Sequence, residues 1–257
     1  MRILPRLFQY IYCIYAYFLF ILIMFLVFPF IAAASAFGTK GGNFIYRMCR
    51  IWAGIWYFLI GIKHKEIYEW PHDKSKQFIF VANHISYIDI PSVILSIRQP
   101  MRILGKYELV KIPVFGWIYR SAVILVDRRS ALKRAKSVQA LKSAIKKGIS
   151  IFIYPEGTFN ETKQPLKDFY DGAFRLALET KTSIKPILCI DTQERMHYKS
   201  VFQLTPGKSR VVFLEEIKVD PYKMGDLLLL KQRVYTAMEQ GLRQYRKYNT
   251  NDIIKAS

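Results

Sequence analysis

The chain contains few cysteines and few acidic residues for its length of 257. Its three cysteines, Cys13, Cys49 and Cys189, stand far apart inside apolar stretches. This pattern fits neither a disulfide framework nor a zinc site, so it favours a reducing compartment and gives no reason to expect a metal or cofactor. Only 19 residues are acidic against 39 that are basic, a formal net charge of +20. Such a surplus predicts an anionic partner: lipid head groups, nucleic acid or a phosphorylated substrate.

Charge is also missing from one long segment near the amino terminus. Residues 7–39 carry no charged side chain, whereas about 20 helical residues suffice to cross a ~30 Å hydrocarbon core. Three interpretations compete: a cleaved signal peptide ending near the small residues AAASAFG, a single spanning helix, or a helical hairpin in one leaflet that bends near Pro29 or Gly38. The apolar region is much longer than that of a usual signal peptide, which argues against cleavage.

A second apolar piece, residues 51–62, is too short to cross, and its tryptophans suit the membrane interface. Basic residues flank the long apolar run on both sides, which pulls both ends toward the cytoplasm. They are Arg2, Arg6, Lys40, Arg47 and Arg50. We therefore expect an N-terminal apolar two-helix membrane anchor over residues 1–65, on the cytoplasmic face of the inner membrane, with a true span as the alternative.

Short apolar runs recur in the rest of the chain and read as strands covered on both faces. They span residues 77–82, 101–105, 122–126, 150–154, 184–190 and 210–215. Helical patterns lie between or after them, near residues 90–97, 131–147, 171–180 and 224–248. Alternating strands and helices predict an α/β domain over residues 66–257, with a mostly parallel sheet flanked by helices.

Polar residues follow four of the predicted strands directly. The four groups are Asn83-His84, Gly105-Lys106, Asp127-Arg128-Arg129 and Pro155-Glu156-Gly157-Thr158. In open α/β sheets, ligands bind beyond the carboxyl ends of the strands. If these strands are parallel neighbours, all four groups meet at one edge. Cations that follow strands directly, here Lys106, Arg128 and Arg129, would hold a phosphate there.

The stretch VANHISYIDIPS places His84 and Asp89 five positions apart. Residues five apart on a helix are about 140° out of phase, so the two would not face each other there. Pro91 instead predicts a helix that begins near Asp89, and the preceding HISYI would form a turn that folds His84 back. An ionised Asp89 would fix the imidazole tautomer and leave the other nitrogen free as a base. Such a base suits proton removal from a hydroxyl that attacks a carbonyl.

Ser86 lies between these two residues and suggests a nucleophile, but no GxSxG elbow surrounds it. We expect Ser86 to serve as a turn or capping residue. A membrane serine hydrolase is the second hypothesis. A non-catalytic basic module for nucleic acid or anionic membrane is the third, and it gives no reason for His84, Asp89 and Glu156 at strand ends.

Together, NHISYID, GWIYRSAVILVDRR, YPEGT and IKPILCI resemble the four ordered blocks of the glycerolipid acyltransferase family, above all its bacterial 1-acyl-glycerol-3-phosphate acyltransferases. The resemblance covers roughly residues 45–215, and the apolar amino end is similar to the family's two-helix membrane motif. It implies transfer of a fatty acyl group from acyl-CoA or acyl-acyl-carrier protein to the 2-hydroxyl of lysophosphatidate at a membrane surface, without a cofactor or a nucleic-acid partner.

The resemblance also implies roles for individual residues. His84 is the general base and Asp89 its orienting partner, while Glu156 and Gly157 help build the acceptor site. Lys106 and Arg128 match positions associated with the acceptor phosphate. The substrate-binding set expected from both arguments is Asn83, Ser86, Lys106, Arg128, Arg129, Glu156, Gly157 and Thr158.

One departure concerns the third block, where Phe159 and Asn160 follow Thr158 in place of the family's usual arginine. A bidentate phosphate contact is therefore missing from its usual place. Lys106, Arg128 or Arg129 compensates, or the acceptor is a different lyso-lipid, such as lyso-ornithine lipid.

Overall fold

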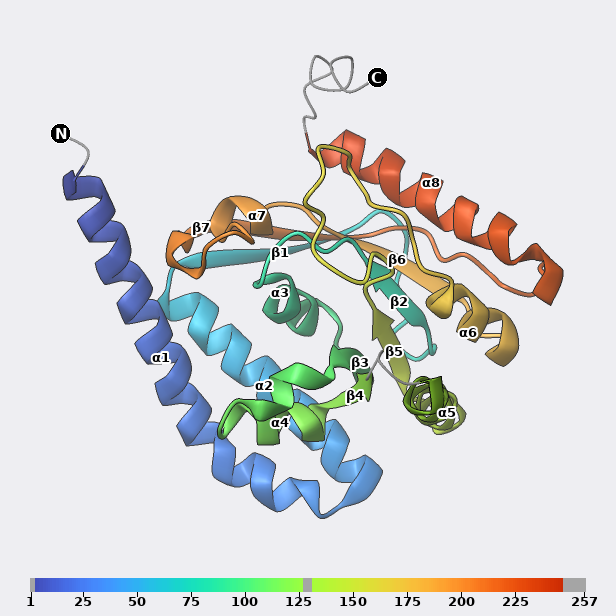
Figure 1. Ribbon diagram of the computed structural model, residues 1–257, viewed down its shortest axis with the longest axis horizontal. Coiled ribbons are helices and arrows are strands. Elements are labelled where there is room, and N and C mark those ends of the chain that lie inside the picture. The colour runs from blue at the N-terminus through green and yellow to red at the C-terminus, as the bar shows by residue number, and fades with distance from the viewer. Residues whose placement is uncertain (1–2, 127–130, 247–257) are drawn as a thin grey trace.

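A computed structural model describes residues 3–126 and 131–246 (Figure 1). The expected phosphate ligands Arg128 and Arg129 fall outside these described residues. The helices are α1 (Ile3–Ser35), α2 (Gly38–Leu59), α3 (Asp89–Ser96), α4 (Phe115–Ala122), α5 (Ala131–Lys146), α6 (Gly172–Thr180), α7 (Thr192–Arg195) and α8 (Leu227–Tyr245), with short 3-10 turns η1 (Tyr107–Lys111), η2 (Val201–Gln203) and η3 (Met224–Asp226).

The strands form one seven-stranded sheet in the order β1-β7-β6-β2-β5-β3-β4. They are β1 (Ile62–Tyr68), β2 (Ile79–Ala82), β3 (Met101–Lys106), β4 (Val123–Val126), β5 (Ser150–Ile153), β6 (Ile184–Cys189) and β7 (Gly207–Phe213). From β6 to β4 every neighbouring pair is parallel, β7 runs antiparallel to β6, and β1 runs parallel to β7. The fold is therefore α/β with a mostly parallel sheet, as expected.

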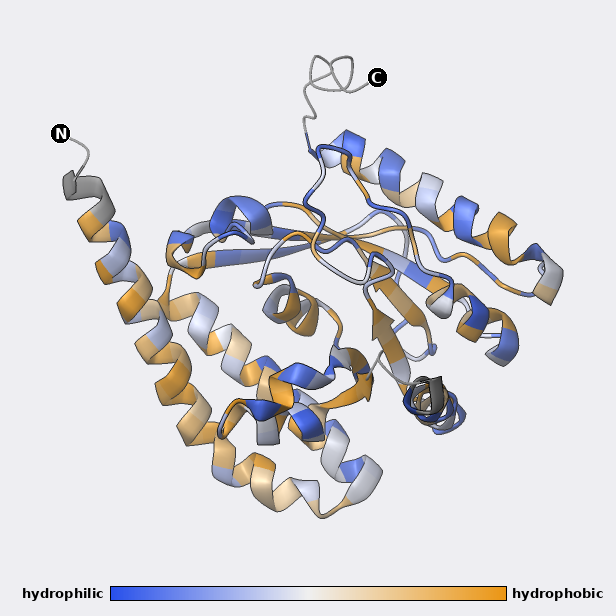
Figure 2. Ribbon diagram, in the orientation of Figure 1, coloured by the Kyte–Doolittle hydropathy of each residue, from blue (hydrophilic) through white to orange (hydrophobic). Residues whose placement is uncertain are grey.

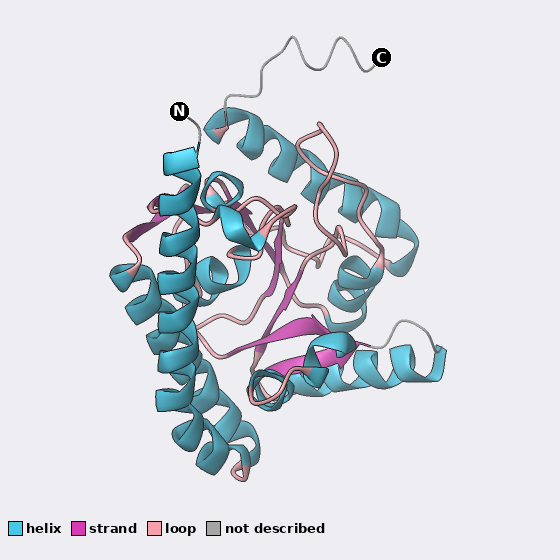
Figure 3. Cartoon of the chain, turned by 60° about the vertical axis from the view of Figure 1, so that its left-hand side comes forward, coloured by secondary structure: helices cyan, strands magenta, loops and turns pink. Residues whose placement is uncertain are grey.

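Helices cover both faces of this sheet, and Figure 3 shows strands between two helical layers. On one face, α5, α6 and α8 pack over a core that includes Ile151, Phe174 and Leu188. On the other face, α3 covers Phe80 and Phe213, with α2 beside it. Strands β2, β5 and β6 are buried along their whole length, which explains why their sequences are almost entirely apolar; Ser150 and Lys185 are the buried polar exceptions.

Helices α1 and α2 form a hairpin along one side of the molecule (Figure 1). The chain reverses at Gly38, whose φ of 52° favours glycine, whereas α1 continues through Pro29. Indole N–H groups hold the two helices together: Trp56 donates to the Ala16 carbonyl at 2.7 Å and Trp52 to the Phe20 carbonyl at 3.1 Å. The expected two-helix arrangement is confirmed, and of the two bend positions considered, Pro29 and Gly38, the chain turns at Gly38.

Helix α1 presents an apolar surface outward, which Figure 2 shows in orange. Its segment Leu7–Ser35 is long and apolar enough to cross a membrane, and among the described residues it is the one helix that meets both criteria. Large apolar side chains are exposed along it, among them Phe8, Ile14, Phe18, Phe25, Leu26 and Phe30. The hairpin is thus a membrane-anchor candidate by length, composition and exposure.

The sequence did not predict β1, because IKHKEIY carries four consecutive charged or polar side chains, residues 63–66, instead of an apolar run. It forms an edge strand, paired only with β7 in the described sheet. The expected division between residues 65 and 66 falls inside this strand. Helix α4 was not predicted either, since its sequence continues into the apolar strand β4 without a turn signal.

Candidate active site

The strands that precede the four polar groups are adjacent in the sheet. The order β2-β5-β3-β4 brings their carboxyl ends to one edge. Val81 is level with Ile153, so His84 and Glu156 both lie three residues beyond a matched pair. Strand β3 lies two strands from β2, roughly 10 Å away at the usual spacing. The predicted convergence of strand ends is confirmed for the three groups that the structure describes.

His84 and Asp89 contact each other at this edge. The imidazole Nδ1 of His84 lies 2.9 Å from Oδ2 of Asp89. Residues 84–88 form the expected turn, and α3 begins at Asp89 with Pro91 in its first turn. The carboxylate therefore sits at a helix N-terminus, which stabilises its ionised form. With Nδ1–H donating to Asp89, the imidazole keeps a lone pair on Nε2.

The Asp89 carboxylate is fully buried, and protein groups satisfy both of its oxygens. Oδ2 also accepts the backbone N–H groups of Ile85 at 2.7 Å and Ser86 at 2.8 Å. Oδ1 accepts the hydroxyl of Thr192 at 2.5 Å. A buried carboxylate with this many donors has one fixed orientation, so Asp89 can hold the imidazole ring in place.

Aromatic rings enclose the His84 imidazole. The Tyr154 ring stacks on it at a centroid distance of 3.9 Å and an interplanar angle of 12°. The Phe159 ring contacts it at 4.3 Å and also packs against Tyr87. The His84 side chain keeps 15% of its surface exposed, and its Nε2 bonds to none of the described residues. The ring is therefore fixed at one end and accessible at the other.

Glu156 connects the first and third polar groups. Its Oε1 accepts the His84 backbone N–H and its Oε2 accepts the Lys167 backbone N–H, both at 2.9 Å. The side chain is buried, and this burial raises the pKa of Glu156 to about 7, while the two backbone donors oppose the rise. Gly157 follows with a φ of 72°, a turn conformation that favours glycine. Glu156 thus fixes the backbone beneath the imidazole.

Asn83 and Ser86 support the turn from inside the protein. Both are fully buried. The Asn83 side chain donates to the Cys189 carbonyl at 2.9 Å and accepts the Cys189 N–H at 2.8 Å. The Ser86 hydroxyl donates to the Met196 carbonyl at 2.6 Å. Both side chains bond to backbone groups at the end of β6 or after it, as expected for Ser86 as a turn residue, whereas Asn83 was expected to bind substrate.

Cations lie along the same edge. Lys106 is exposed at the end of β3. Thr158 is also exposed, and its hydroxyl lies 2.7 Å from Nζ of Lys167. Lys167 therefore places a cation next to the third block, where Phe159 replaces the family's usual arginine. No group of three or more His, Cys, Asp or Glu side chains able to hold a metal ion occurs in residues 3–126 and 131–246.

Sequence reasoning missed two residues of this site. Thr192 follows β6, and nothing in its local sequence indicates a contact with Asp89, which lies 103 positions away. The parallel pairing of β6 with β2 is the signal that could have found it. Lys167 lies in a loop that returns to Glu156 after 11 residues, so its place depends on tertiary structure alone.

The Acyltransferase family model matches residues 63–190. The 1-acyl-sn-glycerol-3-phosphate acyltransferase of Haemophilus influenzae is 26% identical over 191 residues, 74% of this chain and 78% of that protein. A chloroplastic enzyme of the same name from Arabidopsis thaliana is 27% identical over 198 residues, 77% of this chain.

The chain spans about half the length of the plant and algal relatives it matches. The crystal structure of the 1-acyl-sn-glycerophosphate acyltransferase from Thermotoga maritima has a TM-score of 0.71 and 20% sequence identity. That similarity covers 95% of this chain and 97% of the other, and it shows the fold, including the helical hairpin. With the family model matched across β1 to β6, the chain belongs to the Acyltransferase family.

Proposed function

We propose that this protein transfers a fatty acyl group from a thioester to the sn-2 hydroxyl of 1-acyl-glycerol-3-phosphate and releases phosphatidate. The donor is acyl-CoA or acyl-acyl-carrier protein. The observation that carries the proposal is the 2.9 Å contact between His84 and buried Asp89 at the carboxyl edge of a parallel sheet. The names of the relatives support the choice of acceptor.

In this mechanism the free Nε2 of His84 accepts the proton of the acceptor hydroxyl as its oxygen attacks the thioester carbonyl. Asp89 holds Nδ1–H and stabilises the imidazolium that forms. The tetrahedral intermediate then expels the thiolate, which takes the proton from His84. No acyl-enzyme forms, and the buried, bonded hydroxyl of Ser86 supports this route over the serine-hydrolase alternative.

The acceptor phosphate is assigned to the cations along the edge. Lys106 and Lys167 are the candidates among the described residues, and Arg128 and Arg129 are candidates by sequence. An ammonium and a phosphate form a charge-assisted pair that needs no fixed planar geometry. Lys167 would thus replace part of the contact that an arginine at position 159 makes in the family motif. If it does not, an acceptor with another head group, such as lyso-ornithine lipid, becomes the better substrate.

The hairpin of α1 and α2 is assigned to the inner membrane, with the catalytic domain on the cytoplasmic face. Three observations support this location: the uncharged residues 7–39, the exposed apolar side chains of α1, and the basic residues at both ends of the run. A surface-bound hairpin would bring the site to the depth at which the lyso-lipid presents its hydroxyl.

An acceptor panel tests the proposal most directly. Purified protein in detergent receives one radiolabelled acyl thioester, either acyl-CoA or acyl-acyl-carrier protein. The acceptors are lysophosphatidate, lysophosphatidylethanolamine, lysophosphatidylcholine and lyso-ornithine lipid. We expect labelled phosphatidate from lysophosphatidate and less product from the others. Product from another acceptor alone would reassign the substrate, and thioester hydrolysis without any acylated lipid would contradict acyl transfer.

A further inference from the structure

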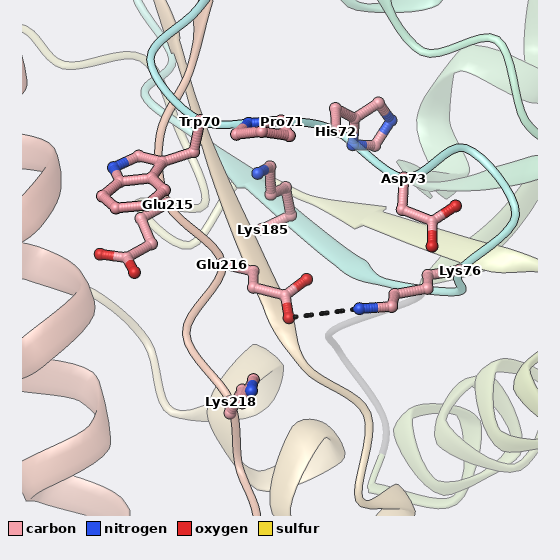
Figure 4. A pocket seen from close by; sticks show the side chains of 9 residues that line it. All are labelled: Trp70, Pro71, His72, Asp73, Lys76, Lys185, Glu215, Glu216 and Lys218. Carbon is pink, nitrogen blue, oxygen red and sulfur yellow. Dashed lines mark ion pairs between the residues drawn. The ribbon is translucent and has the colours of Figure 1, made fainter.

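A second pocket opens on the edge of the sheet opposite to His84, where β2 and β6 begin and β7 ends (Figure 4). Its volume is about 620 Å³, within the range of small-molecule sites. It is lined by Trp70, Pro71, His72, Asp73, Lys76, Lys185, Glu215, Glu216 and Lys218. The proposed acyl transfer does not use any of these residues.

The distinctive residue of this pocket is Lys185. It lies on a central strand, level with Phe80 of β2, and only 1% of its surface is exposed. A lysine is almost never buried to this degree without a partner. The structure gives the Lys185 ammonium no hydrogen bond and no ion pair with the described residues. In Figure 4 the ammonium points toward Trp70 and Pro71, into the pocket.

A second polar side chain beside it also lacks partners. Both ring nitrogens of His72 are buried without a hydrogen bond within the described residues. The ring packs against Phe78 and Phe213 at centroid distances of 5.7 and 5.1 Å. Buried polar groups are normally paired, and those that are not call for a missing molecule. Lys185 therefore gives the pocket floor an ammonium without a hydrogen-bond acceptor among the described residues, and the His72 ring lies beside it.

The charges around this floor select the kind of acceptor. Glu216 pairs with Lys76 at 3.8 Å, while Glu215 and Asp73 add two further negative charges to the wall and Lys218 adds one positive charge. A phosphate dianion would meet stronger repulsion from these carboxylates than a singly charged carboxylate would. The Trp70 ring, 53% exposed, and Pro71 offer an apolar surface next to the ammonium.

We propose that this pocket binds a small organic monocarboxylate. Its carboxylate lies on the Lys185 ammonium, and its apolar or aromatic body lies against Trp70 and Pro71. The site is separate from the acyl-transfer edge, and the proposal stands or falls independently of the acceptor of that reaction.

Calorimetric titration of the full-length protein in detergent tests the site, with benzoate as the probe and inorganic phosphate as the competing class. We expect benzoate to bind and phosphate to bind more weakly or not at all. Lys185→Met should weaken benzoate binding by roughly 30-fold or more, the effect of removing one partner of a buried charged pair. Lys208→Met removes an exposed lysine of β7 outside the pocket and should bind benzoate like the native protein.

Two further measurements distinguish a loss of benzoate binding from a loss of folding. Trp70→Ala changes an exposed side chain and should weaken benzoate binding at least threefold with the fold intact. Without benzoate, Lys185→Met should unfold at or above the native midpoint, because methionine removes a buried ammonium that makes no hydrogen bond or ion pair with the described residues. Equal benzoate binding by native protein and Lys185→Met, tighter binding of phosphate than of benzoate, or a clearly lowered midpoint for Lys185→Met would each overturn the proposal.

Discussion

The Thr192 hydroxyl lies 2.5 Å from Oδ1 of Asp89, the carboxylate oxygen that does not face His84. It joins the segment after β6 to the first residue of α3. Each Asp89 oxygen thus has its own donors: Thr192 on one side, and His84 with two backbone N–H groups on the other. Substitutions at His84 and at Thr192 can therefore test the two sides of the Asp89 carboxylate separately.

The first prediction concerns the base itself. His84→Ala should lower kcat by about 10²–10⁴-fold, the usual contribution of general acid–base catalysis. The measurement is phosphatidate formation under saturating lysophosphatidate. Ser86→Ala is the matched control within the same turn, and it should keep most of the turnover. A dead Ser86→Ala protein with an active His84→Ala protein would favour the hydrolase hypothesis.

The second prediction concerns Asp89. In Asp89→Asn the imidazolium loses its counter-charge and Nδ1–H loses its best acceptor, so kcat should fall by about 10²–10⁴-fold. Lysophosphatidate KM should change little, since Asp89 is buried and does not face the substrate. Asp73→Asn, in the exposed loop before β2, is the control. A large rise in KM with an unchanged kcat would contradict the orienting role.

The third prediction isolates the support behind Asp89. Thr192→Val keeps the side-chain shape but leaves Oδ1 without its hydroxyl donor, so the free energy of unfolding should fall by about 1–3 kcal/mol. Denaturant unfolding measures this change. Thr205→Val serves as control, because the Thr205 hydroxyl makes only 3.2 Å contacts with backbone carbonyls. The pH profile of kcat should shift for Thr192→Val alone, which a purely structural role would not produce.

The fourth prediction follows from Glu156. Burial raises its pKa from 4.5 to about 7 in the folded state, so the folded protein binds a proton more tightly than the unfolded chain does. Its stabilising effect is complete below pH 4.5 and is lost as the pH rises to about 7, by up to about 3 kcal/mol. Unfolding experiments between pH 5 and 8 should show this loss in the native protein. Glu156→Gln lacks the titrating group, so a decline of equal size in that variant would refute the assignment.

The fifth prediction tests the cations. Lys106→Ala and Lys167→Ala should each raise the lysophosphatidate KM by about tenfold or more, since hydrogen bonds to charged groups contribute about 1.5–3 kcal/mol. Turnover at saturation should stay near the native value. Lys147→Ala, beyond the far end of α5, is the matched control. Unchanged KM values for both edge variants would move the phosphate contact to Arg128 and Arg129.

Much of the fold and of the contact between His84 and Asp89 was predictable, because those features depend on local chemistry. Continuous apolar strands indicated a covered parallel sheet, and Pro91 located the start of α3 and hence the turn that brings His84 to Asp89. Thr192 and Lys167 were not predictable, since their positions result from strand pairing and from a returning loop. Lys185 was not predicted as a pocket residue, because the otherwise apolar sequence IKPILCI indicates a core strand.

Tyr57 of α2 has a practical consequence for work on this protein. Its hydroxyl lies 2.9 Å from the Ile88 carbonyl, next to Asp89, and 2.8 Å from the Ser92 hydroxyl. The apolar hairpin is thus hydrogen-bonded to the helix that begins with Asp89, the proposed orienting carboxylate. Deleting the hairpin to obtain a water-soluble fragment would remove these hydrogen bonds from α3 and weaken the contact between His84 and Asp89. Crystallisation and screening therefore need the whole chain in detergent or nanodiscs.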